Sequence, residues 1–269
     1  MLKARVLTAL VLLSAFLSAL FLLPKMAWAL LMLGVILICA REWSNIASFT
    51  GFQSGLYLLL TLFIGLMLLP EHSPSVDLLI YGITFFFWAL LVPLWLSKQW
   101  KTRKLPLMAL TGWILLVPTW LALVELRSIS PELLLGLMAV VWVADSAAYF
   151  AGRRFGRHKL APAISPGKTW EGVAGAFLGV TLYGVVWEMW IGSAAPFSSG
   201  LLPGILLLWL LALFSILGDL FESWMKRVAG IKDSGRLLPG HGGVLDRIDA
   251  LTAAMPVAAF GLLLGNYAL

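Results

Sequence analysis

Charged residues are scarce in this sequence. Asp, Glu, Lys and Arg make up 12% of its 269 residues, whereas 61% are hydrophobic and the mean hydropathy is +0.96. A water-soluble globule needs more polar side chains than this to cover its surface, so the composition excludes an ordinary soluble domain. We also expect no nucleic-acid partner, because a net charge of +6 in so apolar a chain has a simpler explanation in membrane topology.

Cysteine is nearly absent, and internal repeats and long polar segments are missing. The single cysteine, Cys39, lies within an apolar run, so it cannot form a disulfide within the chain and belongs to no zinc or redox motif. No segment between the apolar runs is long enough to fold as a separate soluble domain. Without a repeat, the sequence does not support a transporter built from duplicated halves.

Long apolar runs dominate what is present. They are continuous rather than alternating, which indicates membrane-spanning helices and not the strands of a barrel. We expect an all-α, polytopic integral membrane protein with about nine transmembrane helices. The expected helices span residues 6–23, 26–40, 55–70, 76–97, 106–125, 131–151, 172–191, 200–222 and 249–267.

The N-terminus resembles a secretory signal, with a basic start and an apolar run. The run from Val6 to Leu23 is longer than the roughly 15 residues of a signal core, so we expect a retained first helix. If the N-terminus is cytoplasmic, nine helices place every one of the 19 Lys and Arg residues except Lys25 and Arg127 on the cytoplasmic side. This asymmetry follows the positive-inside rule and predicts a cytoplasmic N-terminus.

Acidic residues gather at the cytoplasmic ends of the last four expected helices. Ionisable groups at a membrane boundary are costly and therefore indicate a functional site. The group comprises Asp145, Glu171, Asp219, Glu222, Asp233, Asp246 and Asp249, whereas Glu42 lies alone at an earlier loop. Nearby cations Arg153, Arg154, Arg157 and Lys159 are explained by topology and by attraction to the inner leaflet.

Helical spacing brings several of these groups together. If the helix after Asp219 continues, Ser223 and Lys226 follow on the same face, and Asp246 and Asp249 share a face at the start of the last helix. A few carboxylates beside cations are how proteins hold Mg²⁺ on a nucleotide. For Asp249 alone, capping of the helix N-terminus is an equal alternative.

The segment PGHGG, residues 239–243, joins the last two helices. Its glycines favour the left-handed conformations of an anion-binding nest, although a flexible turn is the simpler interpretation of glycines alone. The flanking cations Lys232, Arg236 and Arg247, and the helix that follows, favour a phosphate site. His241 fits a phosphate donor, a general acid or a turn residue, and a lone histidine does not decide between them.

Two upstream motifs add polar groups. ISPGKTWEG, residues 164–172, is not a phosphate-binding P-loop, because Pro162 stands where a glycine is required and no strand is expected before it. Lys168 nevertheless remains a candidate for phosphate binding. On the sixth helix, Asp145, Tyr149 and Gly152 lie on one face, and Asp145 needs a partner because it lies within an apolar run.

These motifs together resemble a known family. Residues 223–249, SWMKRVAGIKDSGRLLPGHGGVLDRID, resemble the signature of phosphatidate cytidylyltransferases, the CDP-diacylglycerol synthases, without a departure. SPGKTWEG and the Asp145, Tyr149, Gly152 segment resemble upstream motifs of the same family. The resemblance is specific over the second half of the chain and generic over the first 125 residues or so.

The resemblance implies a reaction, a location and partners. CTP and phosphatidate would give CDP-diacylglycerol and pyrophosphate with Mg²⁺, and whether a second cation takes part stays open. The enzyme would be a homodimer in the bacterial inner membrane among membrane lipids, with phosphatidate in the inner leaflet and a site facing the cytoplasm. Residues 1–130 would form a helical scaffold and residues 131–269 the catalytic half.

The expected site residues fall into three sets. Metal ligands would be Asp219, Asp246 and Asp249, with Asp145 a further ligand or an organiser of the site. The catalytic set is Asp219, Asp246, Lys226, Arg247 and His241, and the substrate-binding set is Lys168, Arg227, Lys232, Arg236, Gly242, Gly243 and Ser223. We expect direct in-line displacement at the α-phosphorus without a covalent enzyme intermediate.

Two other functions are compatible with parts of this pattern. A CTP-dependent lipid kinase would use similar chemistry at the γ-phosphorus. An ion-coupled transporter is less favoured, because its carboxylates would lie near the membrane midplane, whereas these crowd one face.

Overall fold

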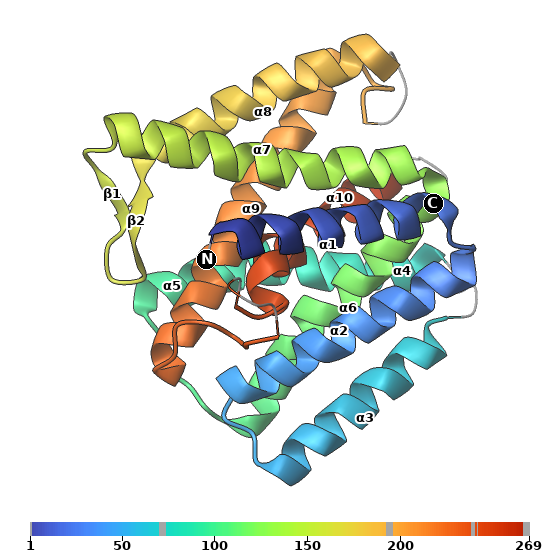
Figure 1. The fold of residues 1–269 in the computed structure, drawn as a ribbon, viewed down its shortest axis with the longest axis vertical. Helices are drawn as coiled ribbons and strands as arrows, with labels where there is room; N and C mark the ends of the chain where they lie inside the picture. The colour runs from blue at the N-terminus through green and yellow to red at the C-terminus, as the bar shows by residue number, and fades with distance from the viewer. Residues whose placement is uncertain (1, 70–73, 192–195, 238–239, 241, 266–269) are drawn as a thin grey trace.

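The computed structural model describes residues 2–69, 74–191, 196–237, 240 and 242–265. Its elements are almost all helical (Figure 1). They are α1 (Leu2–Leu22), α2 (Lys25–Ile46), α3 (Gly51–Met67), α4 (Pro74–Phe86), a π-helical turn (Phe87–Leu91), α5 (Val92–Lys98), α6 (Leu105–Ile129), α7 (Pro131–Phe155), β1 (Lys159–Ala161), β2 (Ser165–Thr169), α8 (Trp170–Ile191), α9 (Leu201–Ala229) and α10 (Leu245–Leu264).

Each expected helix coincides with a helical segment of the structure. The expected helix 76–97 corresponds to α4, the π-turn and α5 taken together. Among the described residues, seven helices are long and apolar enough to cross a membrane, while α3 and the apolar part of α1, Leu13–Leu22, are shorter. The all-α polytopic class is therefore confirmed. The count of nine spans, the side on which the N-terminus lies and the division at residue 130 stay predictions.

A small hairpin is the exception to the helical class. The sequence predicted no strand before residues 164–172, and this prediction is wrong: β1 and β2 pair antiparallel, with Lys159 opposite Thr169 and Ala161 opposite Ser165. Figure 1 shows the hairpin projecting beside the adjoining ends of α7 and α8. The strand β2 leads directly into α8, so the hairpin fixes the position of Lys168 at this end of the molecule.

The helices α7 and α8 approach each other closely because small residues line their contact. A Cβ atom at Gly175 would lie 2.3 Å from the Cβ of Ala151, and one at Gly172 would lie 3.0 Å from the carbonyl oxygen of Ala148. Small residues at such contacts allow membrane helices to pack backbone against backbone. The adjoining parts of α7 and α8 therefore pack tightly against each other.

Buried tryptophans tie α2 to α6. Trp28 donates through Nε1 to the carbonyl of Leu123 at 3.1 Å, Trp120 to that of Ala29 at 2.9 Å, and Trp43 to that of Met108 at 2.9 Å. Each indole buries a large apolar body and satisfies its one donor in the interior. Because α6 also packs against the buried helix α10, the first part of the chain is firmly joined to the last.

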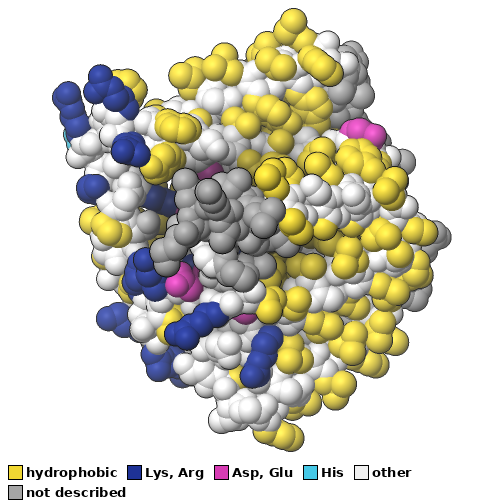
Figure 2. Space-filling view, viewed as in Figure 1, with side chains coloured by type: hydrophobic (Ala, Val, Ile, Leu, Met, Phe, Trp, Pro, Cys, Tyr) yellow, Lys and Arg dark blue, Asp and Glu magenta, His cyan; other side chains and the backbone are white. Residues whose placement is uncertain are grey.

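Charge is unevenly distributed over the surface. Figure 2 shows Lys and Arg side chains gathered on the side where β1 and β2 lie, while hydrophobic side chains cover most of the rest of this face. We call this side the charged end. The loops that join α2 to α3 and α9 to α10 also lie there, so the predicted site residues share one end of the helical bundle.

Candidate active site

A cavity of about 560 Å³ lies at the charged end, between α7, α8, α9 and the hairpin. Asp145, Tyr149 and Gly152 all line it, which confirms that they share one face of α7. Lys168 and Asp219 complete its polar wall. The volume lies within the range of small-molecule sites, roughly 300–1,000 Å³.

Asp219 is the best-placed carboxylate of this cavity. Its Oδ2 lies 2.7 Å from the ammonium of Lys168, and its Oδ1 accepts a hydrogen bond from the hydroxyl of Ser223 at 3.2 Å. The second contact confirms that α9 continues past Asp219 with Ser223 on the same face. The side chain of Asp219 is 33% exposed, so it is open to a ligand in the cavity.

The hairpin that presents Lys168 is anchored at its base. Glu171, in the first turn of α8, lies 2.6 Å from Nδ1 of His158 and accepts the backbone N–H of the same residue. These contacts join the chain just before β1 to the start of α8. These contacts close the base of the hairpin and so hold the strand that carries Lys168.

Two further carboxylates lie near Asp219. Asp145 on α7 and Asp249 on α10 are each close enough to Asp219 to interact with it electrostatically. Asp249 also accepts the backbone N–H of Ala250 at 2.8 Å. Carboxylates from three separate helices therefore lie within electrostatic range of one another, and two of them, Asp145 and Asp219, line the same cavity.

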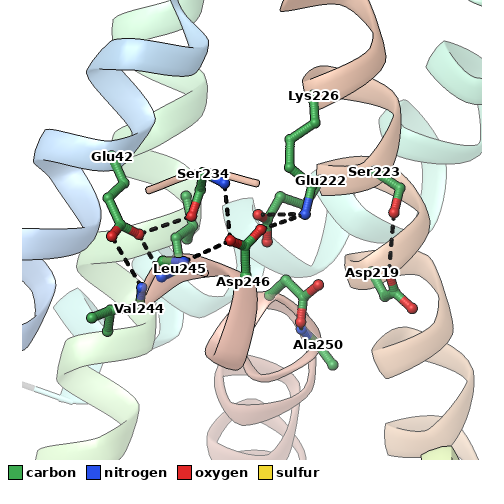
Figure 3. A network of polar contacts seen from close by, with 12 residues as sticks. Glu42, Asp219, Glu222, Ser223, Lys226, Ser234, Val244, Leu245, Asp246 and Ala250 are labelled. Carbon is green, nitrogen blue, oxygen red and sulfur yellow. Dashed lines mark hydrogen bonds and ion pairs between the residues drawn. The ribbon is translucent and has the colours of Figure 1, made fainter. Parts of the chain in front are cut away.

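Behind this group lies a buried ion-pair network centred on Lys226. Its ammonium lies 2.6 Å from Oδ1 of Asp246 and 3.1 Å from Oε1 of Glu222 (Figure 3). Glu222 is only 2% exposed, and among the described residues the Lys226 ammonium is the one donor group that its carboxylate meets. Lys226 therefore compensates two carboxylates that would otherwise be buried without a counter-charge.

Asp246 binds the glycine-containing loop that precedes it. Its Oδ2 accepts the backbone N–H groups of Ser234 at 2.9 Å and Gly243 at 2.8 Å. Gly240 and Gly242 have positive φ angles of 75° and 81°, which confirms the left-handed conformations expected of this segment. The anion held by the Gly243 N–H is thus a carboxylate of the chain itself.

Glu42 belongs to the same network, so the view that it lies alone is wrong. It is 5% exposed and extends from α2 toward the start of α10 (Figure 3). Its carboxylate accepts the hydroxyl of Ser234 at 2.9 Å and the backbone N–H groups of Val244 at 3.0 Å and Leu245 at 2.8 Å. Glu42 therefore satisfies unpaired N–H groups at the N-terminus of α10, as a capping residue does.

Two glycines allow Glu42 to reach these donors. A Cβ at Gly235 would lie 2.3 Å from Oε1 of Glu42, and one at Gly243 would lie 2.5 Å from its Oε2 and 2.1 Å from the hydroxyl of Ser234. Contacts this short are not tolerated by real Cβ atoms. A side chain at either position would displace the hydrogen-bonded carboxylate of Glu42, so close approach favours glycine here.

The remaining predicted cations lie elsewhere. Arg227, Lys232, Arg236 and Arg247 are exposed and do not line the cavity around Asp219. Arg236 instead lines a groove beside α2 and α3. His241 lies outside the described residues. Arg153 and Lys159, which the sequence analysis explained by topology alone, do line the cavity. Their closeness in sequence to Tyr149 and Lys168 could have indicated that they belong to the site.

The donor set around Asp219 can be compared with the needs of Mg²⁺. Within the described residues no group of three or more His, Cys, Asp or Glu side chains is arranged to hold a metal by itself. Mg²⁺ bound to a nucleotide needs only one or two carboxylates, because phosphates and waters supply the rest. Asp145 and Asp219 in one cavity fit this requirement, whereas Asp246 is already engaged by three protein donors.

Comparisons with known proteins agree along the whole chain. The family described as "Cytidylyltransferase family" matches residues 3–264. A phosphatidate cytidylyltransferase of Pseudomonas aeruginosa is 41% identical over 269 residues, which cover 96% of each chain. One of Haemophilus influenzae is 37% identical over 284 residues, covering 97% of this chain and 98% of that protein. One of Staphylococcus epidermidis is 44% identical over 133 residues, about half of each chain.

Proposed function

The chain belongs to the cytidylyltransferase family, and on this premise we propose that it transfers CMP from CTP to phosphatidate, giving CDP-diacylglycerol and pyrophosphate. Relatives named for this reaction match it nearly end to end. The bacterial relatives and the apolar helices make it an enzyme of a bacterial membrane. We place it in the inner membrane with the charged end toward the cytoplasm, where CTP is available, and the homodimer stays a prediction.

The chemistry of the reaction makes electrostatics the main requirement. The attacking group is a phosphomonoester oxygen, whose second pKa of about 6 leaves it largely ionised near neutrality. No strong general base is therefore needed. The difficulty is to bring two polyanions together and to stabilise the departing pyrophosphate, which calls for fixed cations.

The single observation that best supports this function is the Asp219–Lys168 pair in the cavity at the charged end. Lys168, Arg153 and Lys159 line this cavity and supply positive charge for the triphosphate of CTP. Asp219 and Asp145 would hold Mg²⁺ with the nucleotide, and when bound it would neutralise charge on the reacting phosphates. Asp249 stays a predicted ligand beside them.

We assign a positioning role to the buried network. Lys226 binds Asp246, and the carboxylates of Asp246 and Glu42 accept backbone N–H groups of Ser234, Gly243, Val244 and Leu245. These contacts hold the start of α10 and Ser234 against α2 and α9. The metal-ligand role predicted for Asp246 would require a cation to compete with the Lys226 ammonium. Fixed contacts at the start of α10 keep the catalytic groups oriented without reorganisation during the reaction.

Position-specific labelling of CTP tests the reaction. Purified protein is incubated with phosphatidate, Mg²⁺ and CTP that is labelled with ³²P at either the α- or the γ-phosphorus. The α-label should appear in the lipid fraction and the γ-label in released pyrophosphate. A γ-label found in the lipid would identify a CTP-dependent lipid kinase and contradict the proposal.

A further inference from the structure

A second groove, of about 880 Å³, lies between α2 and α3. Leu37 and Ile38 of α2 and Leu59 and Leu62 of α3 form its apolar wall. None of the residues that line it lines the cavity around Asp219. Since both helices belong to the apolar bundle of a membrane protein, an open apolar groove between them is accessible to lipid.

The groove has two cations where it meets the charged end. Arg41 lies near the end of α2, and Arg236 comes from the loop after α9; both side chains are exposed and both line the groove. Arg41 donates to the hydroxyl of Ser54 at 2.5 Å, which holds its guanidinium at the junction of α2 and α3. A guanidinium has five N–H donors, so this contact leaves donors for an anion.

The one carboxylate of the groove wall does not oppose an anion strongly. Glu42 is buried, and its oxygens accept hydrogen bonds from Ser234, Val244 and Leu245. The exposed charges of the groove are therefore positive. An apolar groove lined by two exposed arginines matches a molecule with an acyl chain and a phosphate headgroup.

We propose that this groove is a docking site for phosphatidate, with the phosphate between Arg41 and Arg236 and an acyl chain along α2 and α3. A phosphomonoester has a charge of about −1.5 to −2 near neutrality and so matches two guanidinium groups better than a phosphodiester does. The inference rests on the proposed function for the identity of the lipid. The docked lipid must leave the groove to react, because the Asp219 cavity shares no lining residue with it.

Glycine substitutions give a matched pair of variants. Gly55 of α3 lines the groove, and a Cβ there would meet nothing within 4 Å, so Gly55→Leu should fill the groove without a clash. Gly34 of α2 also has open space around it but does not line the groove, which makes Gly34→Leu the control. Arg41→Gln removes one guanidinium and leaves the apolar wall unchanged.

The test combines photo-crosslinking with kinetics in phosphatidylcholine nanodiscs. Phosphatidate with a diazirine in one acyl chain should label peptides of α2 and α3 in the wild type and in Gly34→Leu. In Gly55→Leu and Arg41→Gln, labelling should fall and the KM for phosphatidate should rise about tenfold, the effect of one lost charge-assisted contact. The KM for CTP should stay unchanged.

Other results separate the two proposals. Unchanged labelling and KM in both Gly55→Leu and Arg41→Gln would overturn the docking site, as would equal labelling by phosphatidylcholine with the same diazirine. Wild-type protein that is labelled in α2 and α3 but transfers no CMP would contradict the proposed function while supporting the groove.

Discussion

At the scale of single residues, Asp219 and Asp246 differ in their surroundings although both lie near the charged end. Asp219 is 33% exposed and faces the cavity with Lys168. Asp246 is 6% exposed, and three protein donors contact it. The same substitution should therefore have different effects at the two positions.

Asn replacements test this difference. Asp219→Asn should lower kcat by a factor of about 10² or more, because it removes charge at the reaction site. The Tm in detergent should change little, because the lost ion pair with Lys168 is partly exposed. Asp246→Asn should lower both kcat and Tm, because Lys226 loses a buried counter-charge. Calorimetry and CMP transfer are measured on the same samples. A wild-type Tm for Asp246→Asn would contradict its positioning role.

Glu42→Gln tests the contact between α2 and α10. A glutamine side chain has one acceptor oxygen and one NH₂ group. At least one of the three groups that donate to Glu42 would therefore face the NH₂ group and lose its acceptor. The expected cost is about 1–3 kcal/mol, enough to lower the Tm by several degrees, and turnover should fall as the loop loosens. Glu188→Gln, which neutralises a half-buried carboxylate of α8, is the control and should match the wild type.

Residues close in sequence were easier to predict than residues far apart. Asp145 with Tyr149 and Asp219 with Ser223 follow from helical spacing alone, because i and i+4 side chains share a face. Glu42 and Leu245 are 203 positions apart, and no local pattern relates them. The same holds for the pairing of Lys168 with Asp219, which depends on how the hairpin meets α9.

At the scale of secondary-structure elements, the hairpin β1–β2 matters most because it presents Lys168 to the cavity. The helices were predictable, because a continuous apolar run long enough to cross a bilayer is stable there only as an α-helix. The hairpin was not, because its strands of 3 and 5 residues lack alternation, and Gly and Pro within SPGKT are poor strand formers. Pairing between the two strands and packing against α7 override this weak propensity.

Lys168→Gln tests what the hairpin contributes. Loss of the ammonium removes both the partner of Asp219 and a charge for the triphosphate, so kcat/KM for CTP should fall by a factor of about 10²–10³. Lys101→Gln, at an exposed lysine in the loop after α5, is the control. It should change kcat/KM for CTP less than about twofold, because a solvated surface charge contributes little. Equal effects of the two substitutions would show that the cavity does not bind CTP.

At the scale of the whole molecule, most Lys and Arg residues lie at one end, while hydrophobic side chains predominate over the rest of the described face (Figure 2). This distribution was readable from the sequence, because it follows from where Lys and Arg fall between apolar runs. The orientation of the charged end remains a prediction. The chain is well suited to testing it, since its only cysteine, Cys39, is buried in the structure.

Single introduced cysteines should report the orientation. Lys101→Cys lies at the charged end and should react with a membrane-impermeant maleimide only in inverted membrane vesicles. Ser128→Cys, exposed near the far end of α6, should react in intact spheroplasts. The wild type, with Cys39 alone, is the background control. The opposite pattern would place the charged end outside the cytoplasm.

The account depends most on carboxylates from separate helices meeting at the charged end to hold a divalent cation with the nucleotide. Anomalous diffraction from crystals grown with Mn²⁺ and CTP measures this directly. We predict a manganese peak at coordination distance, about 2.0–2.2 Å, from an oxygen of Asp219, with Asp145 or Asp249 adjoining and a CTP phosphate as a further ligand. A CTP-bound structure whose manganese lies outside the cavity, without a contact to Asp219, would contradict it.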